Sequence, residues 1–141
     1  MRRAFTLVEV AIVLGVLALM YAIAIPRFND LLDSIHVRGA ATEIQSLFSG
    51  SRHVAITRST LASVDVDPTR RTISISVNGD TIRIHDVGRE HGVQLSATRI
   101  HMSYAPTGMG YGAANLSLVV RRNAAVDTVF VSRLGRVRLS R

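Results

Sequence analysis

The sequence predicts an α+β fold in which a long N-terminal helix, with a transmembrane half and an amphipathic half, packs against an antiparallel β-sheet head. Three observations carry this prediction. Residues 10–25 are apolar without a break, apolar residues then recur at steps of three and four as far as Ala55, and after Thr60 the period changes to two. The chain has 141 residues, which suits one modest domain beside the apolar helix.

The first helical half has the length and composition of a membrane span. A spanning helix needs about 17 to 25 predominantly apolar residues, and residues 5–26 supply them. Arg2 and Arg3 precede the run, so the positive-inside rule places the following domain outside the cytoplasm. The alternatives are a cleaved signal peptide, for which Ala22-Ile23-Ala24 resembles a cleavage site, and a simple signal anchor. Neither alternative explains Glu9, because a carboxylate in lipid normally has a partner.

The second half, residues 27–58, has an apolar stripe and an opposite polar face. Pro26 stands between the halves, where its ring removes a backbone donor, and we expect a kink there. Only the distal stripe is available to cover the sheet of the head. The stripe consists of Phe28, Leu31, Leu32, Ile35, Ile44, Leu47, Phe48 and Ala55. The polar face consists of Asn29, Asp30, Asp33, Glu43 and Arg52.

The head, residues 59–141, reads as short strands. Residues 72–77 and 80–85 alternate around Asn78-Gly79, which is the strongest short hairpin signal. Glycine and asparagine separate the further candidates, so we expect an antiparallel β domain. These candidates are residues 61–66, 93–96, 100–104, 116–121, 126–132 and 136–139.

The composition offers little support for catalysis, cofactors or metals. The chain has no cysteine, which excludes disulfides and thiolate metal sites. Its histidines, at positions 36, 53, 85, 91 and 101, lack metal-ligand spacing, so no metal site is predicted. His85, Asp86, Glu90 and His91 are read as a solvated turn. The glycines around Gly110 follow no parallel-sheet unit and precede no lysine, so nucleotide binding is rejected. We expect no enzyme and no cofactor.

The C-terminal stretch is strongly basic. All 17 basic residues of the chain are arginines, and the formal net charge is +7. In Gly135-Arg136-Val137-Arg138 the two arginines lie on one face of an extended segment. Guanidinium groups match phosphates well, so Arg133, Arg136, Arg138 and Arg141 are candidate DNA contacts. The alternative is an edge strand whose arginines keep it soluble and unpaired.

The first 26 residues resemble the type IV pilin and pseudopilin family. The resemblance rests on the short basic leader, on Phe5-Thr6-Leu7-Val8-Glu9, on the apolar helix and on Pro26. It implies that a prepilin peptidase removes residues 1–4, cutting between Ala4 and Phe5, and methylates the new amino group of Phe5. Ala4 stands where the family usually has glycine. It also implies that Glu9 pairs with the free amino terminus of a neighbouring pilin subunit, while Pro26 loosens the helix for extraction from the membrane.

The head resembles the H-type minor pseudopilins of type II secretion and the related T-type minor pilins. The resemblance lies in residues 40–58, in the glycine-rich residues 106–110 and in residues 129–137. It implies a non-catalytic minor pseudopilin, with a single-pass inner-membrane helix and a periplasmic head, that joins a pseudopilus. The first alternative is a type IV minor pilin acting in pilus assembly or DNA uptake. The second is a membrane-anchored β domain that binds a small ligand.

Overall fold

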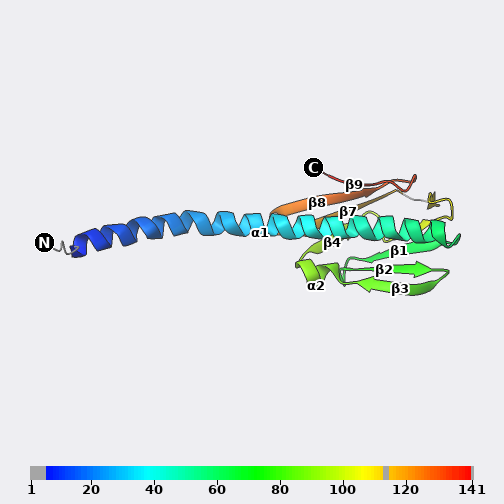
Figure 1. Ribbon diagram of the computed structural model, residues 1–141, viewed down its shortest axis with the longest axis horizontal. Helices are drawn as coiled ribbons and strands as arrows, with labels where there is room; N and C mark the ends of the chain where they lie inside the picture. Colours follow the sequence, from blue (N-terminus) through cyan, green and yellow to red (C-terminus); the bar gives the residue numbers. More distant parts are fainter. Residues whose placement is uncertain (1–5, 113–114, 141) are drawn as a thin grey trace. The chain divides into compact units, whose positions relative to one another are not determined.

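A computed structural model describes residues 6–112 and 115–140 (Figure 1). The chain divides into two compact units, one ending at Leu32 and one beginning at Asp33. Helix α1, Leu7–Thr57, contributes to both units and confirms the predicted long N-terminal helix. Pro26 lies inside this helix, which is assigned without a break at the proline.

The first unit is described from Thr6 onward and is helical from Leu7. Every residue from 6 to 32 is exposed, although most of them are apolar. Among the described residues, α1 is the one helix that is long and apolar enough to cross a membrane. A helix that is apolar on all sides is stable in lipid or among other apolar helices, and it is poorly suited to water.

The second unit, the head, contains two antiparallel sheets. The first has the strand order β3-β2-β1-β5-β6, and the second has the order β4-β7-β8-β9. In the first sheet the strands are β1 Ala62–Asp67, β2 Thr72–Val77, β3 Asp80–His85, β5 His101–Tyr104 and β6 Gly110–Tyr111. In the second sheet they are β4 Gln94–Ala97, β7 Leu116–Arg122, β8 Ala125–Val131 and β9 Val137–Leu139. A short helix, α2 Val87–His91, connects β3 to β4.

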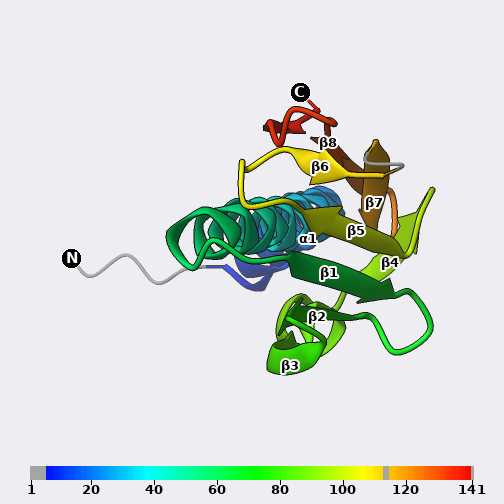
Figure 2. The same ribbon diagram turned by 90° about the vertical axis from the view of Figure 1, so that its right-hand side faces the viewer.

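The distal part of α1 packs against the head with one face, and strands of both sheets lie beside it (Figure 2). Its buried residues recur at helical steps and pack against the inner faces of the strands. They are Asp33, Val37, Ala40, Ala41, Ile44, Leu47, Phe48, Ser51 and Ala55. The predicted packing of the distal stripe, Ile44, Leu47, Phe48 and Ala55, is therefore correct, and Val37 extends the buried stripe beyond the prediction.

The proximal part of the predicted stripe differs from expectation. Phe28, Leu31 and Ile35 are more than half exposed, so they add nothing to the core of the head. Asp33, which was expected on the polar face, is buried instead. The reason is that this turn of α1 faces the end of β7 and the loop after it, where Arg122 and Asn123 bind the carboxylate.

The Asn-Gly hairpin is confirmed. Strands β2 and β3 pair antiparallel and are joined at Asn78 and Gly79, which both have positive φ angles of 52° and 91°. Two consecutive left-handed residues are the requirement of a type I′ turn. The pairing register shifts between Ile75 and Ser76, which marks a β-bulge.

The other predicted strands are present with ends moved by at most one residue, and two elements were not predicted. Strand β6 has only two residues, too few to show a period. Helix α2 occupies the segment that was read as a solvated turn, so that reading is wrong. Its start is capped by Asp86, whose carboxylate accepts from the Arg89 N–H at 2.9 Å, and its end by Gly92 at φ 64°.

Candidate functional site

Glu9 forms a capping box at the start of α1. One oxygen, Oε2, accepts from the Thr6 backbone N–H at 3.0 Å and from the Thr6 hydroxyl at 2.9 Å. The Thr6 hydroxyl oxygen in turn accepts from the Glu9 N–H at 3.2 Å. The signal is Thr-x-x-Glu ahead of an apolar run, and it was present in the sequence but overlooked. Glu9 therefore has a local role in starting the helix, in addition to any role between subunits.

The surface around Glu9 is apolar and open. Leu7, Ile12 and Leu19 are 86%, 61% and 68% exposed, and Leu7 lies on a different side of the helix from Ile12 and Leu19, which are seven residues apart and share a face. Pro26 is also exposed. Ala4 and Phe5, the predicted processing site, lie outside the described residues, as does Arg141. The first part of α1 is thus an exposed apolar helix with one carboxylate in its first turn.

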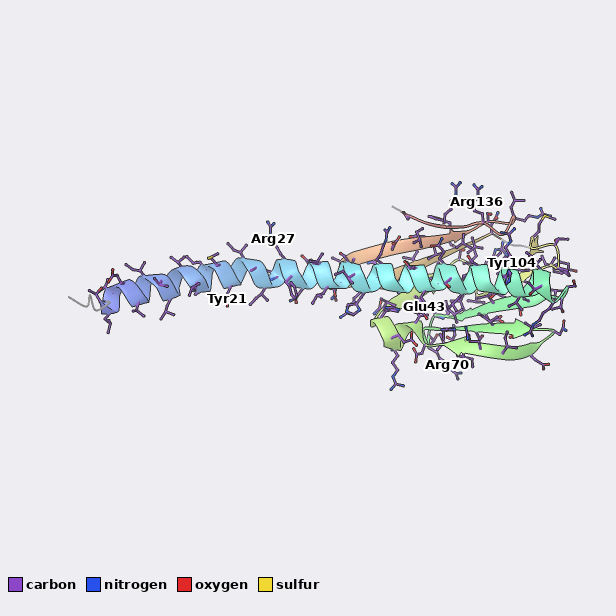
Figure 3. The ribbon with its side chains drawn as sticks, viewed as in Figure 1. Tyr21, Arg27, Glu43, Arg70, Tyr104 and Arg136 are labelled. Atoms are coloured by element: carbon purple, nitrogen blue, oxygen red, sulfur yellow. The ribbon has the colours of Figure 1, made fainter. Side chains whose placement is uncertain are left out.

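The described part of the predicted arginine strip lies on and just before β9, which is the edge strand of the second sheet. Arg136 and Arg138 are exposed, whereas Val137 and Leu139 are half-buried and pack on the core. This is the alternation expected from the sequence. Arg136 points away from the ribbon into solvent (Figure 3). Arg133, in the turn before β9, is exposed as well.

Two glycines hold the strip in place. Gly135 has a φ of 75° and closes the turn from β8 to β9 by donating to the Ser132 carbonyl at 2.9 Å. A Cβ on Gly135 would lie 2.5 Å from the carbonyl oxygen of Gly108, so the two loops touch through their backbones. Arg52 of α1 donates from Nε to that same carbonyl at 2.8 Å. The turn is thereby tied to the helix and positions β9.

The strip borders a surface groove of about 880 Å³. Ser49 and Arg52 of α1 line one part of it, and Phe130, Arg136 and Arg138 line another. The acid nearest in sequence, Asp127, is buried and pairs with Arg38 at 3.7 Å. Among the described residues, no carboxylate forms an ion pair with Arg133, Arg136 or Arg138. Their charge is therefore available to an anionic partner.

Polar contacts join α1 to the second sheet at Asp33, the first buried residue described on this helix. The Asp33 carboxylate accepts from Arg122 Nε at 2.8 Å and from the Asn123 amide at 2.7 Å. Arg122 also donates to the His91 carbonyl at 2.8 Å, so one guanidinium connects α1, β7 and the end of α2. A buried carboxylate is tolerated when it is paired and hydrogen-bonded in this way.

Tyr104 is a second buried polar group, and it has no such partner. Its side chain is fully buried on β5, and its hydroxyl has no hydrogen-bond partner among the described residues. Burial raises the pKa of Tyr104 because the phenolate would lose its hydration, and the nearby positive charge of Arg52 opposes this only in part.

The histidines that were read as a solvated turn instead contact the central helix. Glu43 Oε1 lies 3.1 Å from His85 Nδ1, and Glu43 Oε2 lies 2.8 Å from His91 Nε2. Glu90 of α2 brings its carboxylate close enough that one atom each of Glu43, Glu90 and His91 lie within 4.8 Å of one another. Spacing alone could not reveal this group, because Glu43 is 48 residues from His91.

The long helix and its β head together define the pilin fold, as the sequence predicted. Solved structures of a minor pilin and of a minor pseudopilin share it. Type IV minor pilin FimU of Pseudomonas aeruginosa superposes with a TM-score of 0.64 at 19% identity, covering 74% of this chain and 88% of FimU. The minor pseudopilin EpsH from the type 2 secretion system of Vibrio cholerae gives a TM-score of 0.60 at 12% identity, covering 74% of this chain and 96% of EpsH. At sequence identities this low, the comparison shows that the chains share a fold and nothing further.

No family model matches the sequence, and no curated protein matches it either. The fold therefore rests on the structure and on these two kinds of solved relative.

Proposed function

We propose that this protein is a non-catalytic minor subunit of a pilin-like filament. The observation that carries the proposal is the exposure of all described residues from 6 to 32 on an apolar helix that begins with a single carboxylate. Such a surface requires lipid before assembly and neighbouring apolar helices after it. The shared fold with a minor pilin and a minor pseudopilin supports this reading.

The proposal includes a route of biogenesis. The helix first lies in the inner membrane with the head in the periplasm, and a prepilin peptidase cuts between Ala4 and Phe5. The new α-amino group of Phe5 then stands four residues before Glu9, which is at the start of the same helix. Mass spectrometry of assembled protein should find a methylated phenylalanine at the N-terminus. A chain that keeps Met1 in the filament would contradict this step.

Glu9 is proposed to pair with the α-amino group of Phe5 in the neighbouring subunit. Opposite charges in an apolar bundle attract strongly, and an unpaired one there is costly. Because Glu9 also caps its own helix, Glu9→Ala removes two functions together. Glu9→Gln is sharper, since glutamine also serves in a capping box but carries no charge. Thr6→Val is the converse control, because it removes the capping hydroxyl and keeps the carboxylate.

The expected result is that Glu9→Gln is made and folded but fails to enter filaments, while Thr6→Val enters them. Quantitative immunoblots of sheared filaments and of membranes measure both. If Glu9→Gln assembles as well as the unaltered chain, the pairing role is refuted. If Thr6→Val alone fails to assemble, capping is the function of Glu9 instead.

We further propose which secretion or pilus system the filament belongs to. The sequence analysis favours a type II secretion pseudopilus, with a type IV pilus as the alternative, and the fold is common to FimU and EpsH. Deletion of the gene distinguishes them. Secreted proteins retained in the cell would support the pseudopilus, whereas normal secretion with loss of pili or of DNA uptake would support the pilus.

One observation favours DNA capture as a second candidate function. Arg138 lies exposed on the edge strand β9 and Arg136 lies exposed directly before it, beside a groove that Arg52 also lines, and no described acid pairs with the strip. Phosphate contacts of this kind are electrostatic and depend on salt. The soluble fragment from Arg27 onward suits the test, because all buried residues described lie at or after Asp33.

The test compares two double variants of equal charge. Arg136→Gln with Arg138→Gln removes two arginines of the strip. Arg70→Gln with Arg83→Gln removes two exposed arginines that lie in the turn between β1 and β2 and in β3 of the first sheet. Figure 3 shows Arg70 and Arg136 on opposite sides of the head. If each strip arginine contacts one phosphate of duplex DNA, its loss flattens the slope of log K against log salt by about 0.9, or about 1.8 for two. Equal effects of both variants would show only nonspecific charge attraction.

A further inference from the structure

We propose that Glu43, Glu90 and His91 bind a divalent transition-metal ion of the zinc type, which fastens α2 to α1. The three residues come from two elements far apart in the sequence, and their ligand atoms lie within 4.8 Å of one another. Imidazole and carboxylate are both ordinary zinc ligands. Figure 3 labels Glu43 on α1, and its contact with His91 places it toward α2.

One pair of the ligand atoms already stands near the spacing that an ion requires. Around a tetrahedral zinc with bonds of about 2.0 to 2.1 Å, ligand atoms stand about 3.3 Å apart. Glu43 Oε2 and His91 Nε2 are already 2.8 Å apart, so they must separate by only about half an ångström to admit zinc between them. Zinc takes the lone pair of Nε2, so the neutral His91 ring carries its one proton on Nδ1 once the ion is bound.

The surroundings hold the His91 ring in position for this exchange. Gly39, one turn before Glu43 on α1, leaves room for the ring, since a Cβ there would lie 3.2 Å from His91 Cε1. The His91 carbonyl accepts from Arg122, which is itself held by Asp33. His85 holds the other oxygen of Glu43 at 3.1 Å and so orients the carboxylate as an outer ligand partner does.

Glu90 distinguishes a metal site from a plain hydrogen-bonded contact. Its carboxylate is exposed on α2, and among the described residues it forms none of the hydrogen bonds that join Glu43 to the two histidines. The hydrogen bond between Glu43 and His91 therefore does not require Glu90. A zinc ion would use the Glu90 carboxylate as a third protein ligand and leave the fourth position to water.

The experiment is calorimetric titration of ZnCl₂ into the fragment from Arg27 onward, prepared without a histidine tag. The variants are His91→Ala and Glu90→Gln. The matched control is His101→Ala. His101 of β5 also lies beside a carboxylate, that of Asp65 on the neighbouring strand β1, with 2.5 Å between Nδ1 and Oδ1. This pair is separate from Glu43 and α2. MgCl₂ serves as the control ion, because magnesium prefers oxygen ligands and octahedral geometry.

The expected result is one zinc ion per chain, at least tenfold weaker binding in both His91→Ala and Glu90→Gln, and unchanged binding in His101→Ala. Thermal unfolding gives a second readout. Zinc should raise the Tm of the unaltered fragment, and Glu90→Gln should keep the metal-free Tm while losing that rise. The proposal is overturned if zinc binds Glu90→Gln as tightly as the unaltered chain, if His101→Ala loses binding equally, or if no saturable binding occurs below millimolar zinc.

Discussion

Replacing Tyr104 with phenylalanine should stabilise the head, although it removes a polar group from β5. The tyrosine is fully buried, and its hydroxyl has no hydrogen-bond partner among the described residues. Burying such a group without a partner costs about 1 to 3 kcal/mol. Phenylalanine keeps the ring and its packing, so we expect a gain of about 1 to 2 kcal/mol near neutral pH.

The advantage of Tyr104→Phe should grow in alkaline solution. Burial raises the pKa of Tyr104 in the folded state, so the folded protein holds its proton after the unfolded chain, whose tyrosine titrates near pH 10, has lost it. Folding stability is therefore intact below about pH 10 and falls as the pH rises above it. At pH 11 the unaltered head should have lost about 1.4 kcal/mol through this one group, and the variant none of that amount.

Urea unfolding of the fragment from Arg27 onward, at pH 8 and at pH 11, measures both effects. Tyr111→Phe is the control, because that side chain is 65% exposed and should change stability little at either pH. The reasoning is refuted if Tyr104→Phe is less stable than the unaltered head at pH 8, since the hydroxyl would then have a favourable contact. A gap between the two proteins that stays constant from pH 8 to pH 11 would equally contradict the burial argument.

Two further predictions concern the polar contacts and the turn that positions the arginine strip. Asp33→Ala should lower the free energy of unfolding by about 2 to 3 kcal/mol, because it leaves Arg122 and Asn123 without their carboxylate, and chemical denaturation should show the loss. Gly135→Ala should lower Tm more than Gly79→Ala. Both glycines have positive φ, but only at Gly135 would a Cβ collide with backbone, at 2.5 Å from the Gly108 oxygen, whereas nothing lies within 4 Å at Gly79. Equal Tm changes would show that backbone strain alone matters at both.

The sequence predicted well those features that local pattern determines. The hairpin at Asn78-Gly79 follows from two residues that tolerate positive φ, and the buried stripe from Val37 to Ala55 follows from helical spacing. The alternation of Arg136 and Arg138 with Val137 likewise follows from the pleat of a strand.

Features that depend on distant partners could not be predicted. Asp33 looks like a solvated residue until Arg122 and Asn123, about 90 positions later, meet it. Glu43 and the histidines of β3 and α2 come together only because that end of the first sheet is folded against α1. The capping box of Thr6 and Glu9 is a different case, because its signal, Thr-x-x-Glu before an apolar run, is local and can be read from the sequence.

The start of burial at Asp33 has a consequence for how such a chain can change. None of the described residues before Asp33 contributes to the hydrophobic core, so substitutions in the apolar segment leave the stability of the globular part untouched. The apolar segment and the globular part can then vary independently of each other, as far as folding is concerned. A chimera that joins residues 33–141 to an apolar helix of unrelated sequence should still fold its two sheets against the same core.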